Sequence, residues 1–250
     1  MHYIIQESIY KPQNLQLLLE VLERLELPYD VVKAHADLSL EPEINPQGKV
    51  FVFGAWRMAA VAQQRQWSPA SFLNDNFDYV VWQQQLGTQL LNTNAQVLKF
   101  KEIHDLQGKR YFIRPTKDTK AFDGAVFDAD KVKALQSMTS KAYLLDMDVL
   151  LAPLQVILKE YRLFIVKHSI VTGSIYKLAG KPYFSDLLDE AAIQFAESII
   201  KQWLPSEACV MDLALTEQGY KVIEFNNINS SGFYAANVAK LIQALEYSYN

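Results

Sequence analysis

Cysteine is almost absent from this sequence, which contains only Cys209. One cysteine excludes a disulfide within the chain and any zinc site built from cysteines. Long apolar runs are missing too, because none reaches the ~20 residues of a membrane span. The start of the chain, from Met1 to Glu7, lacks the basic and apolar regions of a signal peptide. We therefore expect a soluble, cytoplasmic protein with no membrane partner, in which Cys209 is a small core residue.

Positive charge is also in short supply, with 24 Lys and Arg against 28 Asp and Glu and a net charge of −4. A general nucleic-acid binder needs clustered Lys and Arg for its phosphate contacts, so we expect no nucleic-acid partner. The sequence has no Gly-x-Gly-x-x-Gly, no Gly-x-x-x-x-Gly-Lys and no Gly-x-Ser-x-Gly. A Rossmann dinucleotide site, a P-loop and a hydrolase nucleophile elbow are therefore not indicated.

The first part of the chain, from residue 1 to about 90, predicts a small α/β unit. Apolar runs at 3–5, 29–33 and 49–53 predict strands, and leucines at helical spacing over 15–25 predict a helix between the first two. The order strand, helix, strand, strand indicates a mainly parallel sheet covered by helices. Three tryptophans are expected to be packing anchors here: Trp56, Trp67 and Trp82.

A hairpin near the other end carries the most informative polar residues. Two extended runs around Asp212 and Glu224 flank the turn 216–219, which contains the glycine that a hairpin favours. Glu224 and Asn226 stand two apart, so in a strand their side chains share one face. Carboxylate and amide oxygens on one face suit a divalent cation such as Mg²⁺. The alternative is a hairpin whose solvent face is merely polar.

A basic segment lies in the middle of the chain, from residue 110 to 124. An apolar strand ends in Arg114, and Lys117, Lys120 and Gly124 follow in the next ten residues. Phosphates need fixed cations and a mobile loop that closes over them to exclude water, and this segment offers both. The alternative is an ordinary solvated basic loop.

A second strand pair is expected at residues 160–177. Glu160 and Arg162 alternate along the first strand, and an arginine there can hold phosphoryl oxygens through two hydrogen bonds. Lys177 ends the second strand, where the alternation of side chains could point it toward Arg162 or away from it. Glu160 could instead be a plain cross-strand partner. Three helices are also expected: 129–138 capped by Asp128, 187–200 capped by Ser185, and 235–247.

These segments together resemble the ATP-grasp superfamily, over residues 91 to 250. Asp212 followed by Glu224-Phe-Asn226 looks like its metal-binding Asp and Glu-x-Asn. The superfamily's usual Lys and glycine-rich loop are replaced here by Arg114-Pro-x-x-Asp-x-Lys-x-Phe-x-Gly124, which resembles a small clade with this arginine variant. The resemblance implies an α/β (α+β) architecture, an ATP-grasp fold of two lobes preceded by a small α/β domain. The implied boundaries are 1–90, 91–155 and 156–250.

The resemblance also implies roles for individual residues. Arg162 and Lys177 would be catalytic, and Asp212, Glu224 and Asn226 would bind the metal. The polar loop after them would contact substrate through Asn229, Ser230 and Ser231. The apolar stretch 149–154 would carry backbone groups that pair with adenine. The implied nucleotide-binding residues are Arg114, Lys117, Lys120, Gly124, Leu151, Ala152, Leu154 and Glu160.

The implied activity is ATP-dependent ligation of a carboxylate to an amine or a thiol through an acyl-phosphate, with ATP and Mg²⁺ as cofactors. The carboxylate and amine substrates, small molecules or peptides, are not identified by the sequence because substrate residues sit in variable loops. Two alternatives remain open: a phosphotransferase (kinase) on the same fold, and a non-catalytic nucleotide-binding module.

Overall fold

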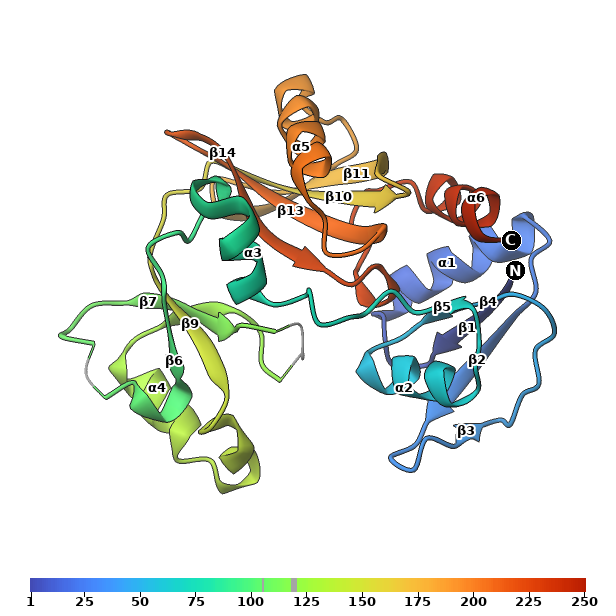
Figure 1. Ribbon diagram of the computed structural model, residues 1–250, viewed down its shortest axis with the longest axis horizontal. Helices are drawn as coiled ribbons and strands as arrows, with labels where there is room; N and C mark the ends of the chain where they lie inside the picture. The colour runs from blue at the N-terminus through green and yellow to red at the C-terminus, as the bar shows by residue number, and fades with distance from the viewer. Residues whose placement is uncertain (105, 118–120) are drawn as a thin grey trace.

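The computed structural model describes residues 1–104, 106–117 and 121–250, which form three sheets (Figure 1). The N-terminal sheet has the strand order β3-β2-β1-β4-β5, and β1 runs parallel to both β2 and β4. A mainly parallel sheet in this part of the chain is therefore confirmed. Its elements are β1 (His2–Gln6), α1 (Pro12–Arg24), β2 (Tyr29–Ala34), β3 (Leu40–Glu41), β4 (Val50–Phe53), α2 (Trp56–Gln64) and β5 (Pro69–Ala70).

The central part of the chain forms a four-stranded antiparallel sheet in the order β6-β9-β7-β8. Helix α3 (Tyr79–Leu86) and the 3₁₀ turn η1 (Gly87–Gln89) precede it. Asp78 caps α3, and Asp128 caps α4 as predicted, because each side chain accepts a hydrogen bond from the first turn. The elements of this part are β6 (Gln96–Lys99), η2 (Phe100–Glu102), β7 (Tyr111–Pro115), β8 (Ala125–Phe127), α4 (Ala129–Gln136), η3 (Thr139–Leu144) and β9 (Asp148–Pro153).

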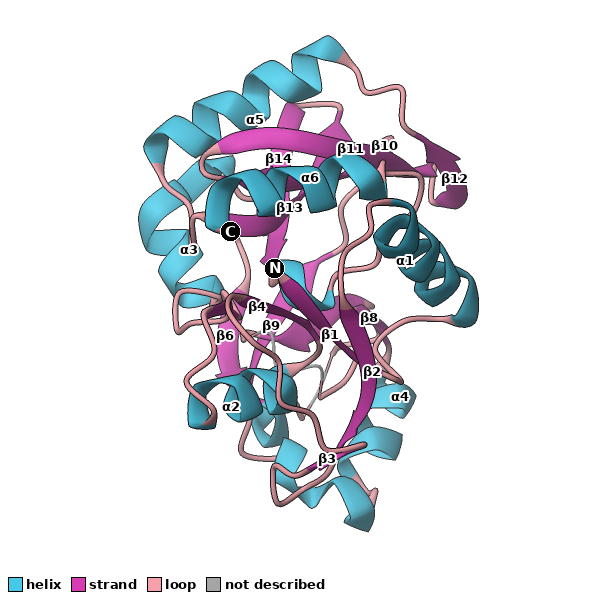
Figure 2. Ribbon diagram, turned by 90° about the vertical axis from the view of Figure 1, so that its right-hand side faces the viewer, coloured by secondary structure: helices cyan, strands magenta, loops and turns pink. Residues whose placement is uncertain are grey.

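The C-terminal sheet is antiparallel in the order β12-β11-β10-β13-β14. The predicted hairpin is confirmed, since β13 and β14 pair with Asp212 opposite Glu224 and Thr216 opposite Gly219. Helix α5 covers this sheet, while α6 lies against α1 (Figures 1 and 2). The elements are β10 (Lys159–Val166), β11 (Ser169–Leu178), β12 (Lys181–Ser185), α5 (Glu190–Gln202), β13 (Ala208–Thr216), β14 (Gly219–Asn226), η4 (Ile228–Ser230) and α6 (Val238–Tyr249).

Two helix starts differ from the prediction. Ser185 ends strand β12 and accepts a hydrogen bond from the Leu187 amide, so it closes a turn, and α5 begins only at Glu190. The last helix begins at Val238, where Asn237 caps it by accepting from the Lys240 amide. In both cases a side-chain-to-backbone bond outside the helix, or a better cap inside the segment, moves the start along the chain.

The packing joins segments that are far apart in sequence. One core lies between the N-terminal sheet, α1, α6 and the C-terminal sheet. Trp82 on α3 is fully buried in a second core with strands β10, β13 and β14, so α3 packs on the C-terminal sheet rather than on the N-terminal one. Trp56 is 56% exposed, which corrects its predicted role as a packing anchor. None of the helices in the described part of the chain is long and apolar enough to cross a membrane.

Candidate active site

A row of charged side chains crosses three neighbouring strands of the C-terminal sheet. Arg162 on β10 lies opposite Asp212 on β13, and Asp212 lies opposite Glu224 on β14. Side chains at directly opposed positions of an antiparallel sheet point to the same face. The two strands around the predicted turn therefore bring the two carboxylates together, and a third strand adds an arginine beside them.

Arg162 and Asp212 form a buried, two-pronged ion pair. The Nε and Nη2 atoms of Arg162 donate to the two carboxylate oxygens of Asp212 at 2.9 and 2.7 Å, and Nη1 donates to the Gly232 carbonyl at 3.2 Å. The side chains are only 11% and 2% exposed. Burial raises the pKa of Asp212, which the guanidinium opposes. Burial lowers the pKa of Arg162, but the carboxylate more than offsets this, so its pKa is raised.

A second ion pair links the central sheet to the C-terminal sheet. Arg114, at the end of β7, donates from Nη1 to Glu224 at 2.8 Å. Its guanidinium lies 5.0 Å from the ring centroid of Trp82, a cation–π contact that fixes its position. The Nη2 atom of Arg114 is buried, and among the described residues it has no hydrogen-bond partner. A buried donor without an acceptor is costly, and an anionic oxygen such as that of a phosphate would satisfy it.

Asn226 joins the two carboxylates. Its amide nitrogen donates to Glu224 at 3.0 Å and to Asp212 at 3.4 Å. Two carboxylates and one amide are a donor set that fits Mg²⁺, which is often held by only one or two carboxylates. No group of three or more His, Cys, Asp and Glu in the described ranges is arranged to hold a metal, which agrees with a set that contains only two such residues.

Glu160 and Lys177 lie beside this row. Lys177 donates to both carboxylate oxygens of Glu160 at 3.2 Å, and the Tyr176 hydroxyl donates to Glu160 at 2.8 Å. Consecutive residues of a regular strand point to opposite faces. Tyr176 and Lys177 both contact Glu160 here because the register between β10 and β11 shifts between Glu160 and Tyr161, at a β-bulge. The bulge thus settles the orientation of Lys177, which strand alternation left open.

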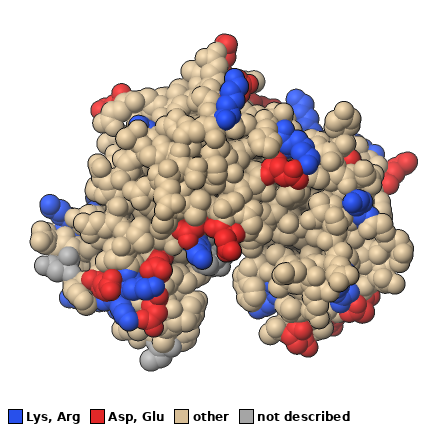
Figure 3. All heavy atoms as spheres, in the orientation of Figure 1, with Lys and Arg blue, Asp and Glu red and all other residues tan. Residues whose placement is uncertain are grey.

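The charged row lines a cavity of about 480 Å³ between the central and C-terminal sheets. Leu154 lines this cavity, whereas Leu151 and Ala152 do not and instead form part of the β6–β9–β7 ladder. Gly124 also lines it, and a Cβ there would come within 2.8 Å of the Phe112 ring and 3.2 Å of the Arg114 side chain. Figure 3 shows the molecule hollowed by a notch, with acidic and basic atoms at its inner edge.

Some residues predicted for the site lie elsewhere. Lys117 lines a different cavity, against helix α2, and Lys120 lies outside the described residues. Asn229 is fully buried, with its amide bonded to backbone groups of the N-terminal sheet and the following segment. Ser231 is also buried, and its hydroxyl donates to the Asn227 carbonyl. The structure therefore gives Asn229 and Ser231 anchoring contacts instead of the predicted exposure to substrate, while Ser230 is partly exposed beside them.

Two tyrosines near the row were not predicted as site residues. Tyr176 and Tyr234 stack at 4.8 Å with an interplanar angle of 9°, and the guanidinium of Arg162 lies 5.0 Å from the Tyr234 ring centroid. Burial and the nearby carboxylates raise the pKa of Tyr176, so its hydroxyl stays a neutral donor. Strand alternation, which puts Tyr176 on the face of Ser174, was the one available signal for it. Tyr234 lies in a loop and carries no such signal.

Comparisons with known proteins agree with this geometry. A family model for an ATP-grasp domain, the third family of its clade, matches residues 29–245. Among curated proteins, no sequence matches this chain. Solved structures with a similar fold include D-alanine–D-alanine ligase from Bacillus anthracis complexed with ATP, with 11% identity, a TM-score of 0.62, and 99% of this chain and 97% of that chain covered.

D-cycloserine synthetase DcsG is another similar structure, with 12% identity, a TM-score of 0.61 and 98% of both chains covered. The ATP-grasp ligase PsnB, complexed with a precursor peptide and AMPPNP, has 13% identity, a TM-score of 0.54, and 99% of this chain and 96% of that chain covered. These likenesses confirm the predicted fold. Because the family model spans most of the chain, the protein belongs to this ATP-grasp domain family.

Proposed function

We propose that this protein is an ATP-dependent, ADP-forming ligase that joins a carboxylate to an amine, or to a thiol, through an acyl-phosphate. The observation that carries the proposal is the row Arg162–Asp212–Glu224, closed by Arg114 from the facing sheet. Membership of an ATP-grasp family supports ATP and Mg²⁺ as the cofactors. The ligase neighbours, of which one is complexed with ATP and another with Mg and ADP, support ligation.

The two steps of this reaction balance in atoms and electrons. A carboxylate oxygen attacks the terminal phosphorus of ATP, and the bond from that phosphorus to ADP breaks as the new P–O bond forms. An amine then attacks the acyl carbon, phosphate leaves, and the amine gives up a proton. The contribution of the protein to the first step is mainly positioning and neutralisation of charge.

The residues divide this work by charge. Asp212, Glu224 and Asn226 would hold Mg²⁺, with Asn226 turning its amide oxygen toward the ion. The ion supplies neutralisation of phosphate charge when it is bound. Arg114 has an unpaired buried donor for a phosphate oxygen, and Arg162 can hold the transferred group by hydrogen bonds. Lys177, held by Glu160, adds a second cation on the same side.

Each arginine now neutralises a predicted metal ligand, so metal and nucleotide should bind together. Removing either charge of a buried pair alone would leave its partner uncompensated. A cation bound to the carboxylates and phosphates bound to the arginines exchange partners without leaving any charge unpaired. Mg²⁺ alone should therefore bind weakly, and Mg-ATP should bind well.

Thermal unfolding tests this exchange. At 100 times its Kd, Mg-ATP should stabilise the fold by about 2.7 kcal/mol, which corresponds to a rise in Tm of about 5 °C or more. Mg²⁺ alone at the same concentration should give less than about a fifth of that rise. Arg114→Met should reduce the rise, while Arg65→Met, which removes an arginine paired with Glu43 on the N-terminal domain surface, should not. An undiminished rise in Arg114→Met would remove Arg114 from the nucleotide site.

The fate of the terminal phosphate tests the reaction class. With γ-labelled ATP and pooled metabolites or peptides, a ligase should release ADP and free labelled phosphate in equal amounts, and only when a carboxylate and an amine are both present. The acyl-phosphate hydrolyses readily, so water must be kept out until the amine arrives. Label retained stably on an acceptor would identify a kinase and overturn ligation. Neither ADP nor phosphate would point to a binding module.

A further inference from the structure

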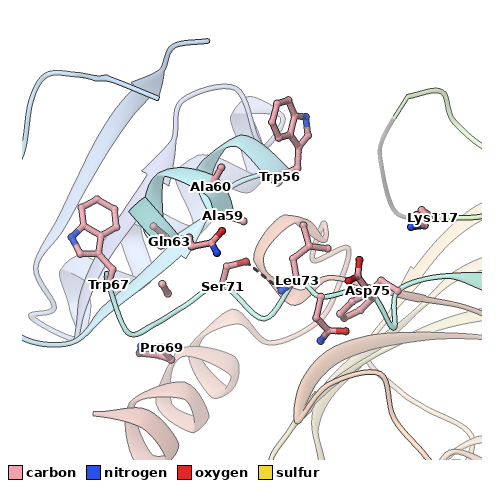
Figure 4. Close-up of a pocket in the computed structure, with 14 residues that line it drawn as sticks. Trp56, Ala59, Ala60, Gln63, Trp67, Pro69, Ser71, Leu73, Asp75 and Lys117 are labelled. Carbon is pink, nitrogen blue, oxygen red and sulfur yellow. Dashed lines mark hydrogen bonds between the residues drawn. The ribbon is translucent and has the colours of Figure 1, made fainter. Parts of the chain in front are cut away.

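A second cavity, of about 710 Å³, lies beside helix α2 on the N-terminal domain (Figure 4). Its walls are α2, the segment from Trp67 to Phe77 and, from the central part of the chain, Lys117. Among the described residues, none lines both this cavity and the cavity of the charged row. A volume of this size falls within the range of pockets that hold drug-sized ligands.

The middle of the cavity is apolar and its two ends are aromatic. Ala59 and Ala60 on α2 present single methyl groups, and Figure 4 shows them between the indoles of Trp56 and Trp67. The exposure of Trp56 is unusual for so large an apolar side chain. Small residues between two aromatic rings leave room for a bulky apolar group and give it flat surfaces to contact.

One end of the cavity carries opposite charges. Figure 4 shows Asp75 and Lys117 toward the same end, on the side of Trp56 and across from Trp67. Asp75 lies in the segment that leaves the N-terminal sheet, and Lys117 comes three positions after Arg114 in the sequence. A carboxylate and an ammonium group at one end match a ligand that carries both an amino and a carboxyl group.

The floor of this cavity is attached to the strand that carries Glu224. Asn229, which follows β14, donates to the carbonyls of Val52 and Ala70 at 2.7 and 2.9 Å and accepts from the Phe72 amide at 2.9 Å. Ala70 lines the cavity, and Phe72 lies between two residues that line it. A ligand here thus contacts elements that are fixed to the charged row at one side, through Asn229, and to β7 at the other, through Lys117.

We propose that this cavity binds the acid substrate of the ligase as a short peptide with a bulky apolar side chain and free terminal charges. This assignment rests on the proposed function for its catalytic meaning. The apolar side chain lies along Ala59 and Ala60 between the two indoles. The peptide's amino and carboxyl groups face Asp75 and Lys117, at the end of the cavity where the chain leads back to Arg114.

Tryptophan fluorescence tests binding without nucleotide or turnover. Leucyl-phenylalanine should change the emission of the intact chain in a saturable way, and the change should be lost when Trp56 and Trp67 are both replaced by Phe. Glycyl-glycine should bind at least about tenfold more weakly because it lacks an apolar side chain. Leucyl-phenylalanine acetylated and amidated at its ends should bind several-fold more weakly because both terminal charges are gone.

A pair of matched variants separates a filled cavity from a damaged helix. Ala60→Phe should abolish the response to leucyl-phenylalanine by filling the cavity, whereas Ala191→Phe, at an exposed alanine of α5, should leave it unchanged. Equal responses to both dipeptides, or an unchanged response in Ala60→Phe, would overturn the proposal. Because the thermal shift with Mg-ATP is measured separately, loss of peptide binding with that shift intact would reject the peptide site alone, and the reverse would reject the nucleotide site.

Discussion

Asp212→Asn is expected to lower ATP turnover at least about a hundredfold, because losing one preorganised charge at a phosphoryl-transfer site typically costs that much. The same change should destabilise the fold. Asp212 is buried and holds Arg162 through two hydrogen bonds, and breaking a buried pair by removing one charge costs about 3–5 kcal/mol. Asparagine retains the shape and one acceptor, so the lower end of that range is expected. Steady-state ATP consumption and urea unfolding measure the two effects.

Glu224→Gln is the matched comparison. Glu224 is more exposed than Asp212 and accepts from Arg114 through a single guanidinium nitrogen, so its loss should cost less stability and a comparable share of turnover. A double-mutant cycle with Arg162→Met separates the pair from the site: Asp212→Asn combined with Arg162→Met should be less destabilised than the sum of the single changes. Near wild-type ATP consumption in Asp212→Asn at limiting Mg²⁺ would contradict the proposed metal role.

Asn229→Ala should cost about 3–6 kcal/mol of unfolding free energy, with no change of charge. The substitution leaves two carbonyls and one amide buried without their partner, and each such group costs about 1–3 kcal/mol. A loss of this size is a large fraction of the roughly 5–15 kcal/mol that holds a typical domain together. Urea unfolding of the intact chain measures it, provided that the denaturant slope is unchanged.

Two controls sharpen this result. Asn45→Ala, at an exposed asparagine of the N-terminal domain, should change the unfolding free energy by less than about 0.5 kcal/mol. Asn229→Asp keeps the size of the side chain but replaces a donor by a carboxylate oxygen facing two carbonyls, so it should destabilise at least as much as alanine. A cost below about 1 kcal/mol for Asn229→Ala would mean that water or a backbone shift satisfies the three groups.

The sequence by itself determined the parts of the site that depend on local repeats. Asp212, Glu224 and Asn226 share a face because a strand repeats every two residues and the turn at 216–219 sets the register of the hairpin. The parallel N-terminal sheet follows from the order of apolar runs and helices, and the cap of α4 from Asp128. These features require only short-range geometry, which residue types and their spacing specify.

The tertiary structure alone decided the contacts that join distant segments. Arg114 meets Glu224 because two sheets face each other, and Lys177 turns toward Glu160 because of a bulge, which no residue pattern signals. Lys117 belongs by sequence to a phosphate loop, yet it lines the cavity beside α2. Asn229 reads as a polar loop residue and is instead buried between two sheets. In each case the burial and partner of a side chain depend on which surfaces pack together, and the spacing of residues along the chain does not contain that information.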